Sequence, residues 1–229
     1  MNGEGRSAIL NLAEFRLHLN RDQLLLLFTS GNLAFLSVDV ALAHSVNSFI
    51  PVYEWIPVLV PPLGALTSFW LAARRDPTLS LRLFHAFLML VGVLIGVLGL
   101  AFHLPRAMLS PLGVFSWSWL VFSAAVLAPL SFAGVSLVGL VASLDEIGED
   151  SGLLSFADVI RLKAPISKTQ HFLWFVGLGF LGAAATSFLD HGQYGYTGYE
   201  WIPVIAGVFA TVVVLGRAVT RPNRSSLMT

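Results

Sequence analysis

The residues best suited to chemistry are histidines and carboxylates that lie where apolar runs end or begin. His44, His103 and His191 each close an apolar run, while Glu54 and Glu200 each open the next one, 9 to 10 residues after a histidine. Imidazole and carboxylate groups are ligands for Fe, Zn, Mn and Cu(II). The chain has no cysteine and only four methionines, which argues against a Cu(I) site.

Two of these junctions have the same sequence pattern. The hexapeptide Tyr-Glu-Trp-Ile-Pro-Val occurs at 53–58 and returns unchanged at 199–204. In both copies a histidine, a short polar loop and the glutamate are retained, while the surrounding apolar positions differ. The third junction has His103 and, further on, Trp117, but Ser116 stands where the glutamate would be. The sequence therefore predicts one internal repeat and leaves a weaker third copy open.

Composition places the chain in a membrane. Hydrophobic residues make up 56% of the 229 and charged residues only 11%, a balance that a water-soluble domain of this length does not show. The absence of cysteine excludes disulfides, iron–sulfur clusters and thiolate metal sites. The first residues carry scattered charges and no cleavage site after a short apolar core, so no signal peptide is predicted.

The apolar runs predict an all-α integral membrane protein with one domain, 1–229, in which helices 1–2 recur as helices 5–6. A helix needs roughly 20 apolar residues to cross a bilayer. Six runs reach that length and form three hairpins, at about 24–43, 54–73, 83–102, 114–143, 172–189 and 200–219. The fourth run is long, so we expect it to be tilted, kinked at Pro129 or extended beyond the membrane. Gly92 and Gly96 predict close helix packing.

The basic residues indicate the orientation. Twelve of the 13 lysines and arginines fall on one side of the predicted spans, and only Arg106 falls on the other. By the positive-inside rule both termini are cytoplasmic, in a bacterial-type inner or plasma membrane, and the loops at 44–53, 103–113 and 191–199 are outside. Residues about 151–165 have apolar side chains at roughly helical spacing, which predicts a cytoplasmic amphipathic helix on the membrane surface.

A ring of six helices would bring the three outer histidines together at one depth. The sequence thus predicts a transition-metal site (Fe, Cu(II), Zn or Mn) made by His44, Glu54, His103, His191 and Glu200, with Asp39 and Asp190 as further ligands or hydrogen-bond partners. Taken singly, each residue has an ordinary structural role. Glutamates are favoured in the first turn of a helix, and histidines and aromatic residues are common at the membrane interface.

Three functions fit these features. The first is a metal-dependent membrane oxidoreductase component or a metal-holding assembly factor, with catalytic residues unassigned. The second is a non-enzymatic permease or scaffold subunit, in which Asn32 and Asp39 face a polar path. The third is a haem b electron-transfer subunit that uses the inner histidines His85 and His171.

The spacing of the histidines argues against the haem hypothesis. His85 and His103 are roughly 27 Å apart along one helix, at opposite surfaces, so the inner histidines are better read as solvated interface residues. The chain has no nucleotide-binding or familiar hydrolase motif. The expected partners are membrane lipid and other membrane subunits, without nucleotide or nucleic acid.

Overall fold

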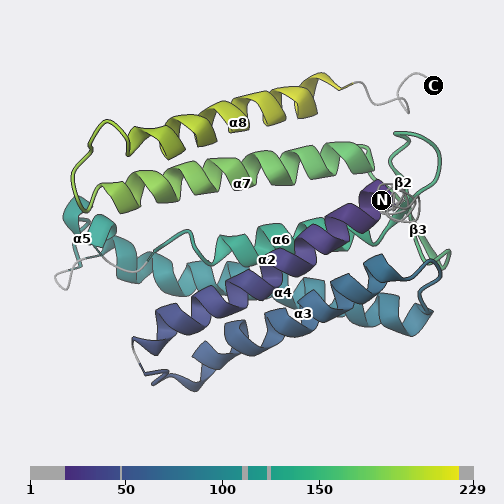
Figure 1. The fold of residues 1–229 in the computed structure, drawn as a ribbon, viewed down its shortest axis with the longest axis horizontal. Coiled ribbons are helices and arrows are strands. Elements are labelled where there is room, and N and C mark those ends of the chain that lie inside the picture. The colour runs from purple at the N-terminus through teal and green to yellow at the C-terminus, as the bar shows by residue number, and fades with distance from the viewer. Residues whose placement is uncertain (1–18, 47, 110–112, 123–124, 222–229) are drawn as a thin grey trace, which may run out of the picture.

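The computed structural model describes residues 19–46, 48–109, 113–122 and 125–221, which form long helices aligned along one axis (Figure 1). Five helices within these ranges are long and apolar enough to cross a membrane. They are α2 (Arg21–Ser45), α3 (Ile56–Ala73, preceded by the 3-10 turn η1, Val52–Trp55), α4 (Leu79–Met108), α7 (Lys168–His191) and α8 (Trp201–Thr220). These helices support the predicted class, a mainly helical multi-pass membrane protein.

The fourth apolar run is not one long helix, contrary to the prediction. It contains the short helix α5 (Trp117–Phe122) and the helix α6 (Leu130–Ala142), with turns between them. Pro129 is the N-cap of α6. A proline lacks the backbone N–H and disfavours helical geometry in the residue before it, so the helix starts afresh here. With 13 residues, α6 is about 20 Å long.

The predicted amphipathic helix at 151–165 is also wrong. The strands β1 (Asp145–Glu146), β2 (Leu153–Phe156) and β3 (Ile160–Lys163) form an antiparallel sheet in the order β1-β2-β3. Ala157 and Asp158 both have positive φ in the turn between β2 and β3. A helix cannot pass through such a turn, which instead matches the twist of a β-hairpin.

The helices pack as neighbouring pairs. α2 packs against α3, α4 against α6, and α7 against α8. α2, α3, α4 and α6 form a group around the two apolar core clusters. α7 joins this group through α6 and through Phe172, which belongs to one of the clusters, and α8 packs on α7 along one side (Figure 1).

Glycines set the spacing of α4 and α6. A Cβ atom on Gly96 would lie 2.6 Å from the backbone nitrogen of Ala133, and one on Gly92 would collide with the hydroxyl of Ser136. The two backbones are therefore too close for larger residues at these positions. This confirms the close packing that Gly92 and Gly96 predict.

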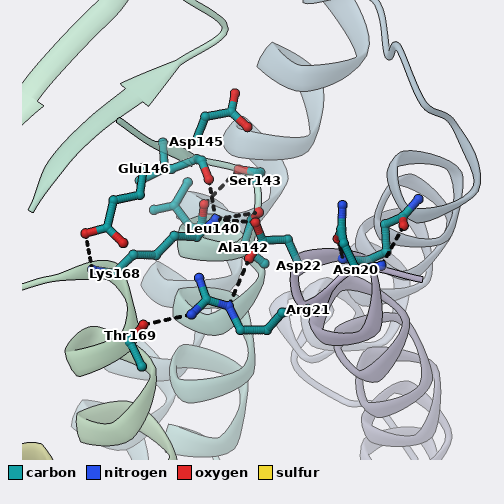
Figure 2. A network of polar contacts seen from close by, with 12 residues as sticks. Asn20, Arg21, Asp22, Leu140, Ala142, Ser143, Asp145, Glu146, Lys168 and Thr169 are labelled. Atoms are coloured by element: carbon teal, nitrogen blue, oxygen red, sulfur yellow. Dashed lines mark hydrogen bonds and ion pairs between the residues drawn. The ribbon is translucent and has the colours of Figure 1, made fainter. Parts of the chain in front are cut away.

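A buried ammonium group ties three helices together at the end of the molecule where α2 begins (Figure 2). The side chain of Lys168, at the start of α7, is inaccessible to solvent, and its Nζ lies 2.8 Å from Oδ2 of Asp22 in α2. The same Nζ donates to the carbonyl oxygens of Ala142 and Leu144, where α6 ends. These carbonyls have no helical partner, so Lys168 satisfies them.

Another ion pair connects the sheet to the end of α8. Asp150, between β1 and β2, accepts a hydrogen bond of 2.6 Å from Arg221. Burial alone raises the pKa of Asp150, but the hydrogen bond and charge of Arg221, together with the hydroxyls of Thr169 and Ser167, lower it below its ordinary value. The carboxylate therefore stays ionised and paired at neutral pH.

Candidate functional site

Two of the predicted ligands meet where α2 ends. His44 lies in the last turn of α2 and His103 near the end of α4, with their ring centroids 6.5 Å apart and their planes at 84°. Nδ1 of His103 lies 3.2 Å from the carbonyl oxygen of Ala125. Since a carbonyl can only accept, Nδ1 is the donor in this contact, and in the neutral ring Nε2 then has the lone pair. Nδ1 of His44 is buried and has no hydrogen-bond partner among the described residues.

Glu54 is a buried carboxylate with an unused acceptor. It lies in η1, only 8% exposed, and its Oε2 makes no hydrogen bond within the described part of the chain. Buried carboxylates are normally paired or hydrogen-bonded, because an unpaired charge away from water is costly. This glutamate therefore differs from an ordinary solvated residue in the first turn of a helix.

Aromatic contacts hold η1 against both histidine-bearing helices. On one side of Glu54, Tyr53 stacks on Phe102, the neighbour of His103, with centroids 5.6 Å apart. On the other side, Trp55 stacks on Phe49 at 4.3 Å, and the ring of Phe49 lies 6.4 Å from that of His44. Glu54 therefore belongs to the same end of the α2–α3–α4 group as the two histidines.

The second copy of the hexapeptide uses its glutamate differently. Glu200 is the N-cap residue of α8, and its Oε2 accepts a 2.5 Å hydrogen bond from the backbone N–H of Thr197. His191 lies in the last turn of α7. In this copy the glutamate bonds within its own loop, a structural role, and its hairpin has most of its further contacts with α6.

The two aspartates lie at the surface of the described structure. Asp39 is exposed on α2 rather than turned into the bundle, as a polar path through the protein would require. Asn32, also expected to face such a path, donates to the backbone carbonyl of Phe28 in its own helix, at 2.8 Å. Asp190 is exposed and, with Gln193, borders a small cavity of about 60 Å³.

The seven predicted ligands are thus divided between the α2–α3 hairpin, the α7–α8 hairpin and α4, which carries His103. Within the ranges that the structure describes, no three histidine or acidic side chains are gathered as a group that could hold a metal ion. His44 and His103 are brought together, with Glu54 at the same end of the bundle. His191 and Glu200 belong to the other hairpin.

His85 is fully buried in the bundle, so the prediction of a solvated interface residue is wrong. Its Nε2 lies 3.3 Å from the carbonyl oxygen of Gly139, and its Nδ1 lies 3.2 Å from the hydroxyl oxygen of Thr67. In this arrangement both ring nitrogens are used, and neither is free to bind a haem iron. His171, the other inner histidine, is bonded through Nδ1 to the carbonyl oxygen of Ser167, at 2.9 Å.

The sequence carried a signal for the burial of His85. It falls on the same helical face as Met89, Gly92 and Gly96, at intervals of three to four residues, and this face packs toward α6. No comparable signal marked Lys168, whose partners are far away in the sequence.

Comparison with protein-family models, curated proteins and solved structures finds no match for this chain. Any statement about its function therefore rests on the residues and their geometry.

Proposed function

We propose that this chain is a multi-pass membrane protein that binds a transition-metal ion at the extracytoplasmic end of the α2–α3–α4 group, through His44, His103 and Glu54. One observation carries the proposal: Nδ1 of His44 and Oε2 of Glu54 are buried at this end without a hydrogen-bond partner among the described residues. Leaving a buried polar group unpaired costs about 1–3 kcal/mol. A bound cation would give both atoms a partner.

The donor set suits a borderline metal. Two imidazoles and one carboxylate are ligands of Fe(II), Mn, Zn or Cu(II). A histidine ligand usually donates its second ring N–H to a carbonyl or carboxylate, and the contact between His103 and Ala125 has that form. Coordination requires the side chains of His44, His103 and Glu54 to rotate toward one another, because they are not a preassembled group.

Three protein ligands leave coordination positions open on the ion. Those positions suit either a membrane oxidoreductase component or an assembly factor that holds a metal for a partner enzyme. Both roles share the same binding site, so metal content is the first property to test.

The proposal includes six membrane spans, with α5 and α6 together making the fourth and both termini in the cytoplasm of a bacterial-type inner membrane. The one-sided distribution of twelve basic residues supports this orientation. α2–α3 and α7–α8 are taken as copies of one hairpin. Their shared hexapeptide and their packing as neighbouring pairs support that relation.

The test is elemental analysis of the protein purified in detergent. We expect close to one ion of Fe, Mn, Zn or Cu per chain in the wild type, and its loss in the variant His44→Ala/His103→Ala and in Glu54→Gln. The matched control is His191→Ala/Glu200→Gln, which changes the equivalent residues of the second copy and should keep the metal.

Equal metal content in all of these proteins would place the ion elsewhere. Absence of metal from the folded wild type, even after incubation with Mn²⁺ and Zn²⁺, would refute the proposal and favour the scaffold or permease class.

A further inference from the structure

A larger cavity lies at the opposite end of the bundle from His44. It has a volume of about 410 Å³ and lies where α2 and α4 begin and where α3 and α6 end. Its charged lining residues are Asp22, Arg74, Arg75, Arg82 and Asp145. A volume of this size is within the range of small-molecule sites, roughly 300–1,000 Å³.

Both acidic residues of the lining are already paired. Asp22 binds Nζ of Lys168 at 2.8 Å, and Asp145 binds Arg82 at 3.1 Å. Figure 2 shows both residues beside Lys168, which does not itself line the cavity. Neither carboxylate is left to neutralise another cation of the lining.

Arg74 and Arg75 supply the charge that remains. They follow directly after α3, and neither guanidinium forms a hydrogen bond or an ion pair with any residue that the structure describes. Two adjacent unpaired guanidiniums at the edge of a cavity attract anions. Guanidinium groups bind phosphate through two parallel N–H donors, which gives both strength and orientation.

The helix ends around the cavity add little net charge. α2 and α4 begin here while α3 and α6 end here, so positive and negative ends of helix dipoles meet at the cavity. The lining also includes three buried apolar residues, Leu26, Leu71 and Ala142. The cavity therefore combines two exposed arginines with buried apolar side chains.

We propose that this cavity is a binding site for a phosphate group, held by Arg74 and Arg75. Two sources of that group fit the site: the headgroup of an anionic phospholipid, whose acyl chains would remain in the bilayer, and a small soluble phosphate compound. The end of the bundle concerned is the predicted cytoplasmic one, where anionic headgroups attract basic residues. This proposal does not depend on the metal site.

The competing explanation is that these arginines act only as topology determinants, like the other basic residues on this side. The experiment therefore compares Arg74→Gln/Arg75→Gln with Arg161→Gln/Arg217→Gln. The second pair removes the same charge from the same predicted side but does not line the cavity. Both variants and the wild type are placed in nanodiscs of phosphatidylcholine containing a minor fraction of phosphatidylglycerol.

Native mass spectrometry then reports how much phosphatidylglycerol each protein retains, and titration with inorganic phosphate reports whether free phosphate binds or displaces the lipid. We expect Arg74→Gln/Arg75→Gln to weaken retention of the lipid, or binding of free phosphate, by roughly tenfold or more, equivalent to about 1.4 kcal/mol. The control pair should stay within twofold of the wild type.

Lipid retention without phosphate binding identifies a headgroup site, and competition by phosphate identifies a site open to soluble ligands. Equal losses in the two variants would mean that surface charge alone is responsible, and would overturn the proposal. Failure of the wild type to bind either probe would overturn it as well.

Discussion

The ammonium group of Lys168 connects three helices, α2, α6 and α7. Replacing it with methionine keeps most of the side-chain volume but leaves Asp22 with Arg21 alone, at 3.6 Å, and removes the donor to the carbonyls of Ala142 and Leu144. Removing one partner of a buried ion pair costs about 3–5 kcal/mol. Because Asp22 is 33% exposed, we expect Lys168→Met to lower the free energy of unfolding by about 2–3 kcal/mol, measured by denaturant titration in detergent.

Lys163→Met is the matched control, since the Lys163 side chain is exposed and donates only to the carbonyl oxygen of Ser151 at 2.8 Å. It should change stability by no more than about 0.5 kcal/mol. The double variant Lys168→Met/Asp22→Asn should cost less than the sum of the two single changes, because the pair is in contact. A stability for Lys168→Met equal to that of Lys163→Met would contradict the role assigned to the ammonium group.

Single residues also show what the sequence could and could not predict about the candidate site. That His44 and His103 share one end of the bundle follows from the apolar runs that they close. The different environments of Glu54 and Glu200 could not be predicted from the sequence, because the two hexapeptides are identical and only their surroundings differ. Glu54 is buried between two residues that stack on Phe102 and Phe49, whereas Glu200 bonds to its own loop.

Among the elements, α4 and α6 are a pair whose close approach can be tested by one substitution. Gly96→Val would press a branched side chain against the backbone of Ala133. Overpacking of this kind costs about 1–3 kcal/mol, so the variant should show a lower Tm in detergent. Gly179→Val in α7 is the control, because nothing lies within 4 Å of a Cβ atom at Gly179.

A Tm for Gly96→Val equal to that of Gly179→Val would mean that the two backbones are not in close contact. Both variants carry the same gain of helix propensity, because valine is a better helix former than glycine, so the difference between them reports packing alone.

The elements that the sequence predicted well are those with long apolar runs. The predicted spans 24–43, 54–73, 83–102, 172–189 and 200–219 each fall on a helix, with ends that differ by up to six residues. The errors lie where the pattern was short or interrupted. At 151–165 a few apolar residues fit helical spacing, but the positive φ angles of Asp150, Ala157 and Asp158 direct the chain into a hairpin.

At the scale of the whole molecule, the number of membrane crossings is decided by α5 and α6. α6 alone, at 13 residues, is about 20 Å long and too short for a core of about 30 Å. Figure 1 nevertheless places α5 at one end of the bundle and the strands that follow α6 at the other. The segment from α5 to α6 therefore runs the length of the bundle beside α4, which is the path that six crossings require.

The absence of cysteine allows this to be tested by labelling single-cysteine variants with a membrane-impermeant maleimide in intact cells. Ile50, Val159 and Tyr194 are suitable sites, 81%, 67% and 83% exposed. With six crossings, Ile50→Cys and Tyr194→Cys react from outside, and Val159→Cys reacts only after the membrane is opened. With five, Tyr194→Cys and Val159→Cys exchange behaviours. That result would turn the two hexapeptides to opposite faces of the membrane, and the α2–α3 and α7–α8 hairpins would no longer share one orientation.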